Sequence, residues 1–151
     1  MGRGQTFVAC VTAQYKCDRL IRASKAISDN QKAKLSVVSV VNTADAESER
    51  FPEQIAALDH LNNVCGELDV EFTVLYSENP VHAAAKYIKD ARAKQIFTGM
   101  PEQGNSSFVN LMAAVLPKVE VTVLPERESA EERMVSRERH SRLIPGIGTA
   151  L

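Results

Sequence analysis

The residues best suited to chemistry form one glycine-containing stretch, TGMPEQGNSS, at positions 98–107. From Gly99 it reads G-x-x-x-x-G-N-S, one residue away from the phosphate-binding pattern G-x-x-x-x-G-K-[ST]. Asn105 replaces the lysine whose charge holds a triphosphate, and Glu102 adds a negative charge to the loop. The strand-like segments also have no acidic residue at their carboxyl ends, where Mg²⁺ would be bound. The stretch therefore argues against an NTPase.

Two functions remain open for this stretch. The backbone N–H groups of Asn105, Ser106 and Ser107 would begin a helix and could donate to an anion, with the two hydroxyls as further donors. Alternatively, Ser106 or Ser107 is an ordinary helix N-cap that follows a turn at Gly104. The residue types fit a ligand-binding loop and a plain turn equally well.

The other reactive side chains predict no metal site and no catalytic residue. The three cysteines are odd in number and match no metal or redox spacing, so we expect them to be structural or incidental. The histidines have no carboxylate or cysteine at ligand spacing. Lys16 could serve a ligand phosphate, although a solvated lysine is the simpler expectation. The cysteines and histidines are Cys10, Cys17, Cys65, His60, His82 and His140.

Composition narrows the class of protein. The chain has 151 residues, of which 44% are apolar and 25% charged, and this predicts one domain with a substantial core. Its net charge of -1 leaves no basic excess for nucleic acid. No apolar run is long enough to cross a bilayer and no signal peptide is recognisable, so we expect a cytoplasmic protein without membrane insertion.

Apolar segments of strand length alternate with segments of helical periodicity. This alternation predicts an α/β fold in which helices sandwich a parallel sheet through right-handed crossovers. The predicted strands are 6–12, 35–41, 70–76, 95–98 and 119–124. The residues predicted on the buried helix faces are Leu20, Ile21, Ser24 and Ile27; Ile55, Leu58, Leu61, Cys65 and Leu68 after Pro52; Val81, Ala84, Ile88 and Ala91 after the Asn79–Pro80 cap; and Phe108, Leu111, Met112, Val115 and Leu116.

The sequence after residue 125 breaks this pattern. Residues 126–142 are dense in charges of both signs, which is typical of a solvated helix or a disordered tail. The apolar end, 143–151, is interrupted by glycine and could also pack on a partner. We therefore divide the chain into an α/β domain, 1–125, and a charged C-terminal tail, 126–151.

In a doubly wound sheet, ligands bind beyond the carboxyl ends of the strands where the strand order reverses. If the first and fourth strands are neighbours, the loops 12–16 and 99–107 leave the sheet side by side. This would place the glycine-containing stretch at a ligand site.

Four segments carry a resemblance to a known family: FVACVTAQYKCDRLIRASKAI, KLSVVSVVN, VEFTVLYSENPVHAAAKYIKDARAKQIFTGMP and VEVTVLPE. Over residues 5–125 the chain resembles the universal stress proteins, of the adenine-nucleotide α-hydrolase-like superfold. It is also similar to the stress-protein-like domain of potassium-sensing histidine kinases. The resemblance implies a five-stranded parallel sheet in the order 3-2-1-4-5 and a homodimer formed through strand 119–124.

The resemblance also implies a ligand and the residues that contact it. The ligand would be ATP, AMP or cyclic di-AMP, and no metal is implied. The ATP-binding members carry G-x-x-G-x9-G-[ST] and an aspartate after the first strand, whereas here Glu102 replaces the second glycine and Gln14 or a neighbour replaces the aspartate. The implied contacts are Val11, Thr12, Ala13 and Gln14 to base and sugar, Val40 and Val41 to adenine, and Gly99, Met100, Gly104, Asn105, Ser106 and Ser107 to the phosphates.

These departures favour a non-catalytic regulatory module that binds an adenine nucleotide weakly and acts through a partner such as a transporter or kinase. The alternative is an enzyme of the same superfold that hydrolyses ATP or transfers an adenylyl group. Such an enzyme needs an S-G-G-x-D-S type pyrophosphate signature or a loop lysine, and the sequence has neither. FMN binding is disfavoured because the first loop lacks a run of hydroxyl residues.

Overall fold

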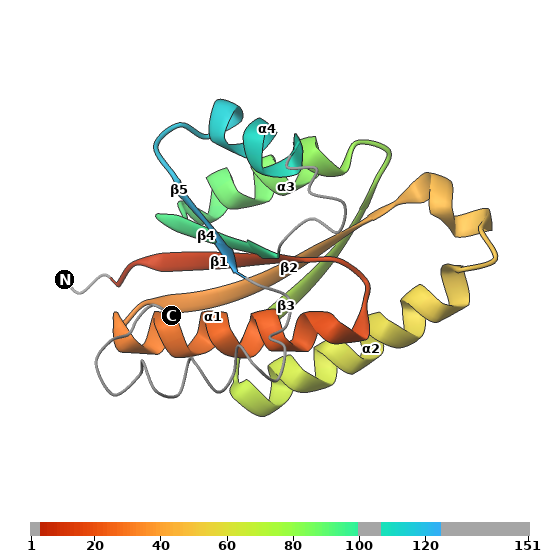
Figure 1. Ribbon diagram of the computed structural model, residues 1–151, viewed down its shortest axis with the longest axis horizontal. Helices are drawn as coiled ribbons and strands as arrows, with labels where there is room; N and C mark the ends of the chain where they lie inside the picture. Colours follow the sequence, from red (N-terminus) through yellow and green to blue (C-terminus); the bar gives the residue numbers. More distant parts are fainter. Residues whose placement is uncertain (1–3, 100–106, 125–151) are drawn as a thin grey trace, which may run out of the picture.

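Five parallel strands in the order β3-β2-β1-β4-β5 form the central sheet of this computed structural model, which describes residues 4–99 and 107–124 (Figure 1). This order and the α/β class confirm the expectation from the sequence. The strands are β1 (Thr6–Val11), β2 (Lys34–Asn42), β3 (Glu71–Ser77), β4 (Gln95–Gly99) and β5 (Glu120–Leu124). The helices are η1 (Tyr15–Cys17), α1 (Asp18–Asn30), η2 (Thr43–Glu47), α2 (Phe51–Leu68), α3 (Pro80–Ala91) and α4 (Ser107–Val115).

The helices cover the sheet in two layers. Figure 1 shows α1 and α2 on one face and α3 and α4 on the other. The chain builds outward from β1 through β2 to β3, and then returns to the other side of β1 with β4. Because β-α-β crossovers are right-handed, this reversal puts the later helices on the opposite face.

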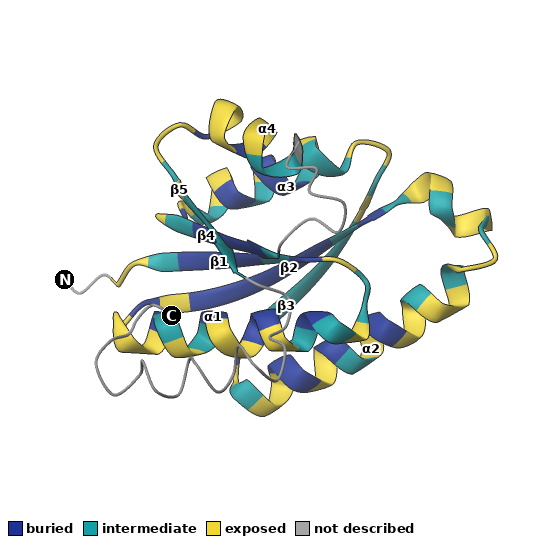
Figure 2. Ribbon diagram, in the orientation of Figure 1, coloured by how far each residue is buried: buried dark blue, intermediate teal, exposed yellow. Residues whose placement is uncertain are grey.

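Each face of the sheet has its own apolar core. Phe7, Ala9 and Val37 pack toward α1 and α2, while Val8, Val38 and Ile96 pack toward α3 and α4. Successive residues of a strand point to opposite faces, so β1 and β2 must be largely apolar on both faces to serve both cores. Ser36 and Ser39 are buried polar exceptions in β2. Figure 2 shows the same division, with buried residues along the central strands and on the inner sides of the helices.

Local signals in the sequence fix several helix ends. The Asn79 side chain accepts a hydrogen bond from the His82 N–H at 3.2 Å, and Pro80 begins α3, as the cap–proline pair predicted. Pro52 lies in the first turn of α2, also as predicted. The turns after α1, α2 and α3 place non-glycine residues in the left-handed region, with φ of 58° at Lys32, 58° at Asp69 and 57° at Arg92.

Three predicted buried positions are wrong. Ile55, Leu111 and Val115 have exposed fractions of 41%, 47% and 54%. The buried face of α2 instead includes Ala57 and Val64, and α4 inserts Met112. Several predicted strand boundaries shift by one residue; Thr12, for example, lies just beyond β1.

Some predicted features lie outside the described residues. These are the side chain of Ser107, the tail 126–151, and the loop residues Met100, Gly104, Asn105 and Ser106. Across residues 4–99 and 107–124, no helix is long and apolar enough to span a membrane.

Adjacent residues of α4 test the corrected helix face. Met112 is completely buried, whereas Leu111 is about half exposed. We expect Met112→Ala to lower the free energy of unfolding by about 2–5 kcal/mol, because it leaves a cavity in the core. The matched variant Leu111→Ala should cost less than about 1 kcal/mol. Urea unfolding measures both; equal losses would contradict this orientation of α4.

Candidate functional site

The strand order reverses between β1 and β4, and both strands end at the same edge of the sheet. The two strands pair in parallel with Cys10 opposite Thr98, and each ends one residue later, at Val11 and Gly99. Neighbouring strands are about 4.8 Å apart. The first loop and the glycine-containing stretch therefore leave the sheet from adjacent points, at the topological switch where ligands bind in doubly wound folds.

Strand β2 extends beyond the carboxyl ends of β1 and β4. Val11, the last residue of β1, is opposite Ser39, but β2 continues to Asn42 with β3 paired alongside it to Ser77. The three extra residues of β2 extend about 10 Å past the end of β1. Val40 and Val41 belong to this extension, so the structure brings them next to the first loop.

The predicted contact residues differ in what they can offer a ligand. The side chains of Val11 and Val41 are each 5% exposed and belong to the interior, so a ligand at the edge would meet their backbone. Val40 is half-buried and packs against the core on the α3 and α4 face. Thr12 is exposed, whereas Ala13 and Gln14 are half-buried. An apolar group could thus lie on Val40 while polar groups meet backbone atoms.

Short hydrogen bonds hold the first loop in one conformation. The Gln14 N–H donates to the Thr12 carbonyl at 2.8 Å, and the Cys17 N–H donates to the Gln14 carbonyl at 3.1 Å. The Thr12 hydroxyl also lies 3.3 Å from the Cys17 sulfur. These contacts shape the loop before any ligand arrives, which reduces the entropy lost on binding.

Two buried hydroxyls near this edge have no hydrogen-bond partner in the described structure. They belong to Ser39 and Thr98, whose residues are 1% and 3% exposed. Ser39 is opposite Val11, and Thr98 is opposite Cys10. No sequence pattern distinguishes them, because a serine or threonine within an apolar strand is usually an ordinary core residue.

A histidine–carboxylate pair connects α2 to the start of α1, which follows the first loop. His60 Nε2 on α2 lies 3.2 Å from Asp18 Oδ2 at the start of α1, and the His60 ring is 5.2 Å from that of Tyr15. Sequence spacing does not predict this contact, because Asp18 and His60 are 42 positions apart. The pair joins α2 to the segment that follows the loop. Within the described ranges, no group of three or more potential ligands could hold a metal ion.

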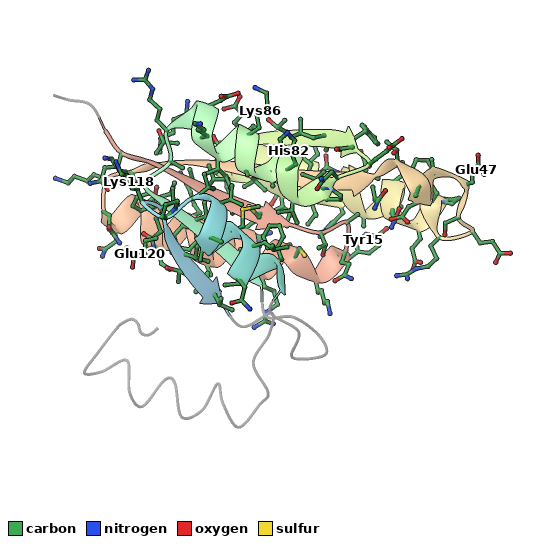
Figure 3. All side chains as sticks on the ribbon, turned by 90° about the horizontal axis from the view of Figure 1, so that it is seen from above. Tyr15, Glu47, His82, Lys86, Lys118 and Glu120 are labelled. Atoms are coloured by element: carbon green, nitrogen blue, oxygen red, sulfur yellow. The ribbon has the colours of Figure 1, made fainter. Side chains whose placement is uncertain are left out.

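Exposed glutamates, together with the exposed Arg50, lie in the segments that follow β2 and β3. Glu47, Glu49, Glu53 and Glu78 are all exposed in the segments that follow β2 and β3. Figure 3 shows Glu47 at the end of the molecule opposite Lys118. These glutamates repel a negatively charged ligand, and the repulsion grows with the charge of the ligand. They therefore favour a ligand with one phosphate group over a triphosphate.

Two cysteines are not poised for nucleophilic chemistry: Cys10, near the end of β1, and Cys65, in the last turn of α2. Burial raises the pKa of the Cys10 thiol to about 12 and that of Cys65 to about 11. A thiol must ionise to attack, so both groups are almost entirely unreactive at neutral pH.

Alkylation measures this protection. Iodoacetamide at pH 8 should leave Cys10 and Cys65 unmodified in the folded protein, because pH 8 lies well below both pKa values, and should label both in guanidinium chloride. In the folded protein, reactivity should rise only as the pH approaches about 11. Peptide mass spectrometry gives the extent at each site. Labelling of native Cys10 at the rate of the unfolded chain would contradict its burial.

Comparison with known proteins gives a fold but no sequence relative: no protein-family model and no curated protein matches the chain. Among solved structures, UspA, a universal stress protein from Lactobacillus plantarum, has a TM-score of 0.61 at 15% identity, covering 84% of this chain and 100% of its own. A universal stress protein in complex with cAMP has a TM-score of 0.58 at 18% identity, over 82% and 98%. One from Archaeoglobus fulgidus in complex with dAMP has a TM-score of 0.54 at 16% identity, over 83% and 98%.

The sheet order, the two helical layers and the switch-point edge define a doubly wound α/β protein of the kind that binds ligands at its carboxyl edge. More narrowly, the chain has the fold of the universal stress proteins, which confirms the resemblance seen in the sequence at the level of fold.

Proposed function

We propose that this protein is a non-catalytic regulatory module of the universal stress protein type that binds an adenine nucleotide at the carboxyl edge of β1 and β4. The observation that supports this most strongly is the edge itself. Two adjacent strands end together, β2 extends beside them, and an ordered loop follows β1. Proteins of the same fold have been solved with cAMP and dAMP bound.

In this proposal the adenine and ribose lie between the first loop and the extension of β2. Backbone groups of Val11 and Val41 give polar contacts, and the half-buried side chain of Val40 gives an apolar one. Thr12, Ala13 and Gln14 flank the base and sugar. The phosphate is bound by the loop that follows β4 and by the start of α4, through Gly99, Met100, Gly104, Asn105, Ser106 and Ser107.

The preferred ligand is a nucleotide with one phosphate group, such as AMP or cAMP, or the cyclic dinucleotide cyclic di-AMP. The amino terminus of α4, at Ser107, offers N–H groups and the positive end of the helix dipole to one phosphate. The exposed glutamates after β2 and β3 repel additional phosphates. With Asn105 in place of the lysine of a triphosphate loop, ATP should bind more weakly than AMP.

Regulation rather than turnover is supported by two described groups that are not activated as a base or nucleophile. His60 is half-buried in its contact with Asp18 behind the loop, and burial keeps Cys10 un-ionised. We place the protein in the cytoplasm, with a transporter or kinase as the partner that reads its nucleotide state. Release of phosphate, ADP or AMP from ATP by the pure protein would instead identify an enzyme.

Calorimetry with AMP, cAMP, cyclic di-AMP and ATP tests the ligand and the site together. We expect saturable binding of a monophosphate, with ATP weaker. Ala13→Glu puts a carboxylate in the first loop, beside the proposed position of the sugar, and should reduce affinity by at least about tenfold through repulsion of the nucleotide's negative charge. The control is Ala23→Glu, which adds the same charge on the exposed face of α1.

Two results would contradict the nucleotide proposal. One is the absence of binding to any of the four nucleotides. The other is an equal loss of affinity in Ala13→Glu and Ala23→Glu, since that would attribute the loss to net charge and not to the loop.

We further propose that the protein forms a homodimer through strand 119–124. β5 is the last strand of the sheet, and its outer edge pairs with no described strand. The Glu120 N–H donates inward to the Lys94 carbonyl at 3.1 Å, so by alternation the N–H groups of Val121 and Val123 point outward, where a second copy could accept them. The exposed Leu111 and Val115 on the neighbouring α4 would extend the apolar contact.

Light scattering tests the dimer with two matched double variants. Leu111→Glu/Val115→Glu should convert a dimer to a monomer, because it places charges in the apolar contact. Ile55→Glu/Tyr76→Glu removes two equally exposed apolar side chains from α2 and β3, and should leave the mass unchanged. A monomeric wild type, or dissociation by the second variant alone, would contradict this interface.

A further inference from the structure

The end of the molecule opposite the proposed nucleotide edge carries an exposed basic cluster, Lys34, Lys89, Arg92, Lys94 and Lys118. Lys34 begins β2, Lys94 precedes β4, Lys118 precedes β5, and the other two lie at the end of α3. Figure 3 shows Lys118 at this end of the molecule and Glu47 at the other.

Sheet geometry places Lys34 and Lys94 on the same side of the sheet as the end of α3. Lys34 is opposite Thr6, and the Lys94 N–H donates to the Thr6 carbonyl at 2.9 Å, so the two lysines flank the start of β1. Two strand spacings separate them by about 10 Å. Val8 and Ile96 face α3 and α4. Side chains two residues apart in a strand share a face, so Thr6 and Lys94 lie on this side too. Lys34 joins them because it is opposite Thr6. They therefore share a side with the end of α3.

Ion pairs between described residues do not neutralise the charges of this cluster. None of its members forms an ion pair with a residue of the described ranges, whereas Lys25 pairs with Asp29 at 3.1 Å and Lys86 pairs with Asp90 at 2.9 Å. Lys89 and Arg92 also stabilise the carboxyl end of the α3 dipole, which explains their charge without a partner. Lys34, Lys94 and Lys118 lie outside the last turn of any helix, so that explanation does not cover them.

We propose that this basic cluster binds an acidic segment of a partner protein. Its charges are dispersed over the amino ends of β2, β4 and β5. Such a dispersed set of cations can pair with several carboxylates along a peptide chain better than with one small anion. Glu71 and Glu120 interrupt the same edge at β3 and β5, which limits the basic region to a short length. A nucleic acid duplex or an anionic membrane presents a longer uniform negative surface, and a chain with net charge -1 is poorly suited to either.

The cluster is separate from the nucleotide edge, so the protein could bind a ligand at one end and a partner at the other. Contacts between exposed charges are individually weak and are screened by salt. The interaction should therefore form and dissociate rapidly, and it should weaken as ionic strength rises.

Fluorescence anisotropy with a short labelled peptide of alternating glutamate and serine tests the proposal. Binding at about 50 mM salt should weaken severalfold by about 200 mM, as expected for exposed charge pairs. Lys34→Gln/Lys94→Gln should weaken binding about fivefold, because two such pairs are lost. The control, Lys25→Gln/Lys86→Gln, removes the same net charge from lysines that already have partners and should change little.

Equal weakening in the two double variants would overturn the proposal, because net charge alone would then account for binding. Absence of peptide binding at low salt would also overturn it. Tighter binding to a single-stranded oligonucleotide, or to phosphatidylserine vesicles, than to the peptide would show that the class of partner is wrong. None of these results depends on nucleotide binding at the other end.

Discussion

The parallel pairing of β1 with β4 is the contact on which the rest of the architecture depends. It sets Cys10 opposite Thr98 and so brings together two strand ends that are 88 residues apart in the chain (99 − 11, from Val11 to Gly99). Because the chain reaches β4 only after building β2 and β3 on the other side of β1, the pairing also divides the helices between the two faces. The packed core, the position of the first loop and the start of the loop after β4 all follow from this single reversal of direction.

The order of elements was predictable because its causes are local. β1 and β2 serve two cores at once and are therefore mostly apolar on both faces. The Asn79 cap and Pro80 specify the beginning of α3. The face of α4 was not predictable in the same way. Its apolar residues form a stripe wider than the sheet can cover, so the sequence could not decide that Met112 enters the core while Leu111 and Val115 remain exposed. Ile55 was misplaced for another reason: at about 100° per residue it lies about 120° around α2 from Leu61, whereas Cys65 lies only about 40° from Leu61.

The candidate site shows the same limit. The positions of Val11 and Gly99 at one edge followed from the fold, since strand ends are set by topology. The Asp18–His60 pair, the Thr12–Cys17 contact and the unpartnered hydroxyls of Ser39 and Thr98 did not follow, because each depends on where side chains from separate elements meet. The distribution of charge over the two ends of the sheet also depends on where separate elements meet in the fold. The net charge of -1 does not show that Glu47, Glu49, Glu53 and Glu78 follow β2 and β3. Nor does it show that Lys34, Lys94 and Lys118 lie at the amino end of the sheet, together with Glu71 and Glu120.

In the proposed function the two ends of one sheet have different roles, and the nucleotide binds at the carboxyl edge. Amide NMR of the isotopically labelled protein during titration with AMP tests this claim most directly. The largest chemical shift changes should fall at Val11, Thr12 and Ala13 after β1, at Val40 and Val41 on β2, and at Gly99, while Lys34 and Lys94 remain unchanged. Saturable changes centred on Lys34 and Lys94 instead would contradict the account, because the nucleotide would then bind at the opposite end of the sheet.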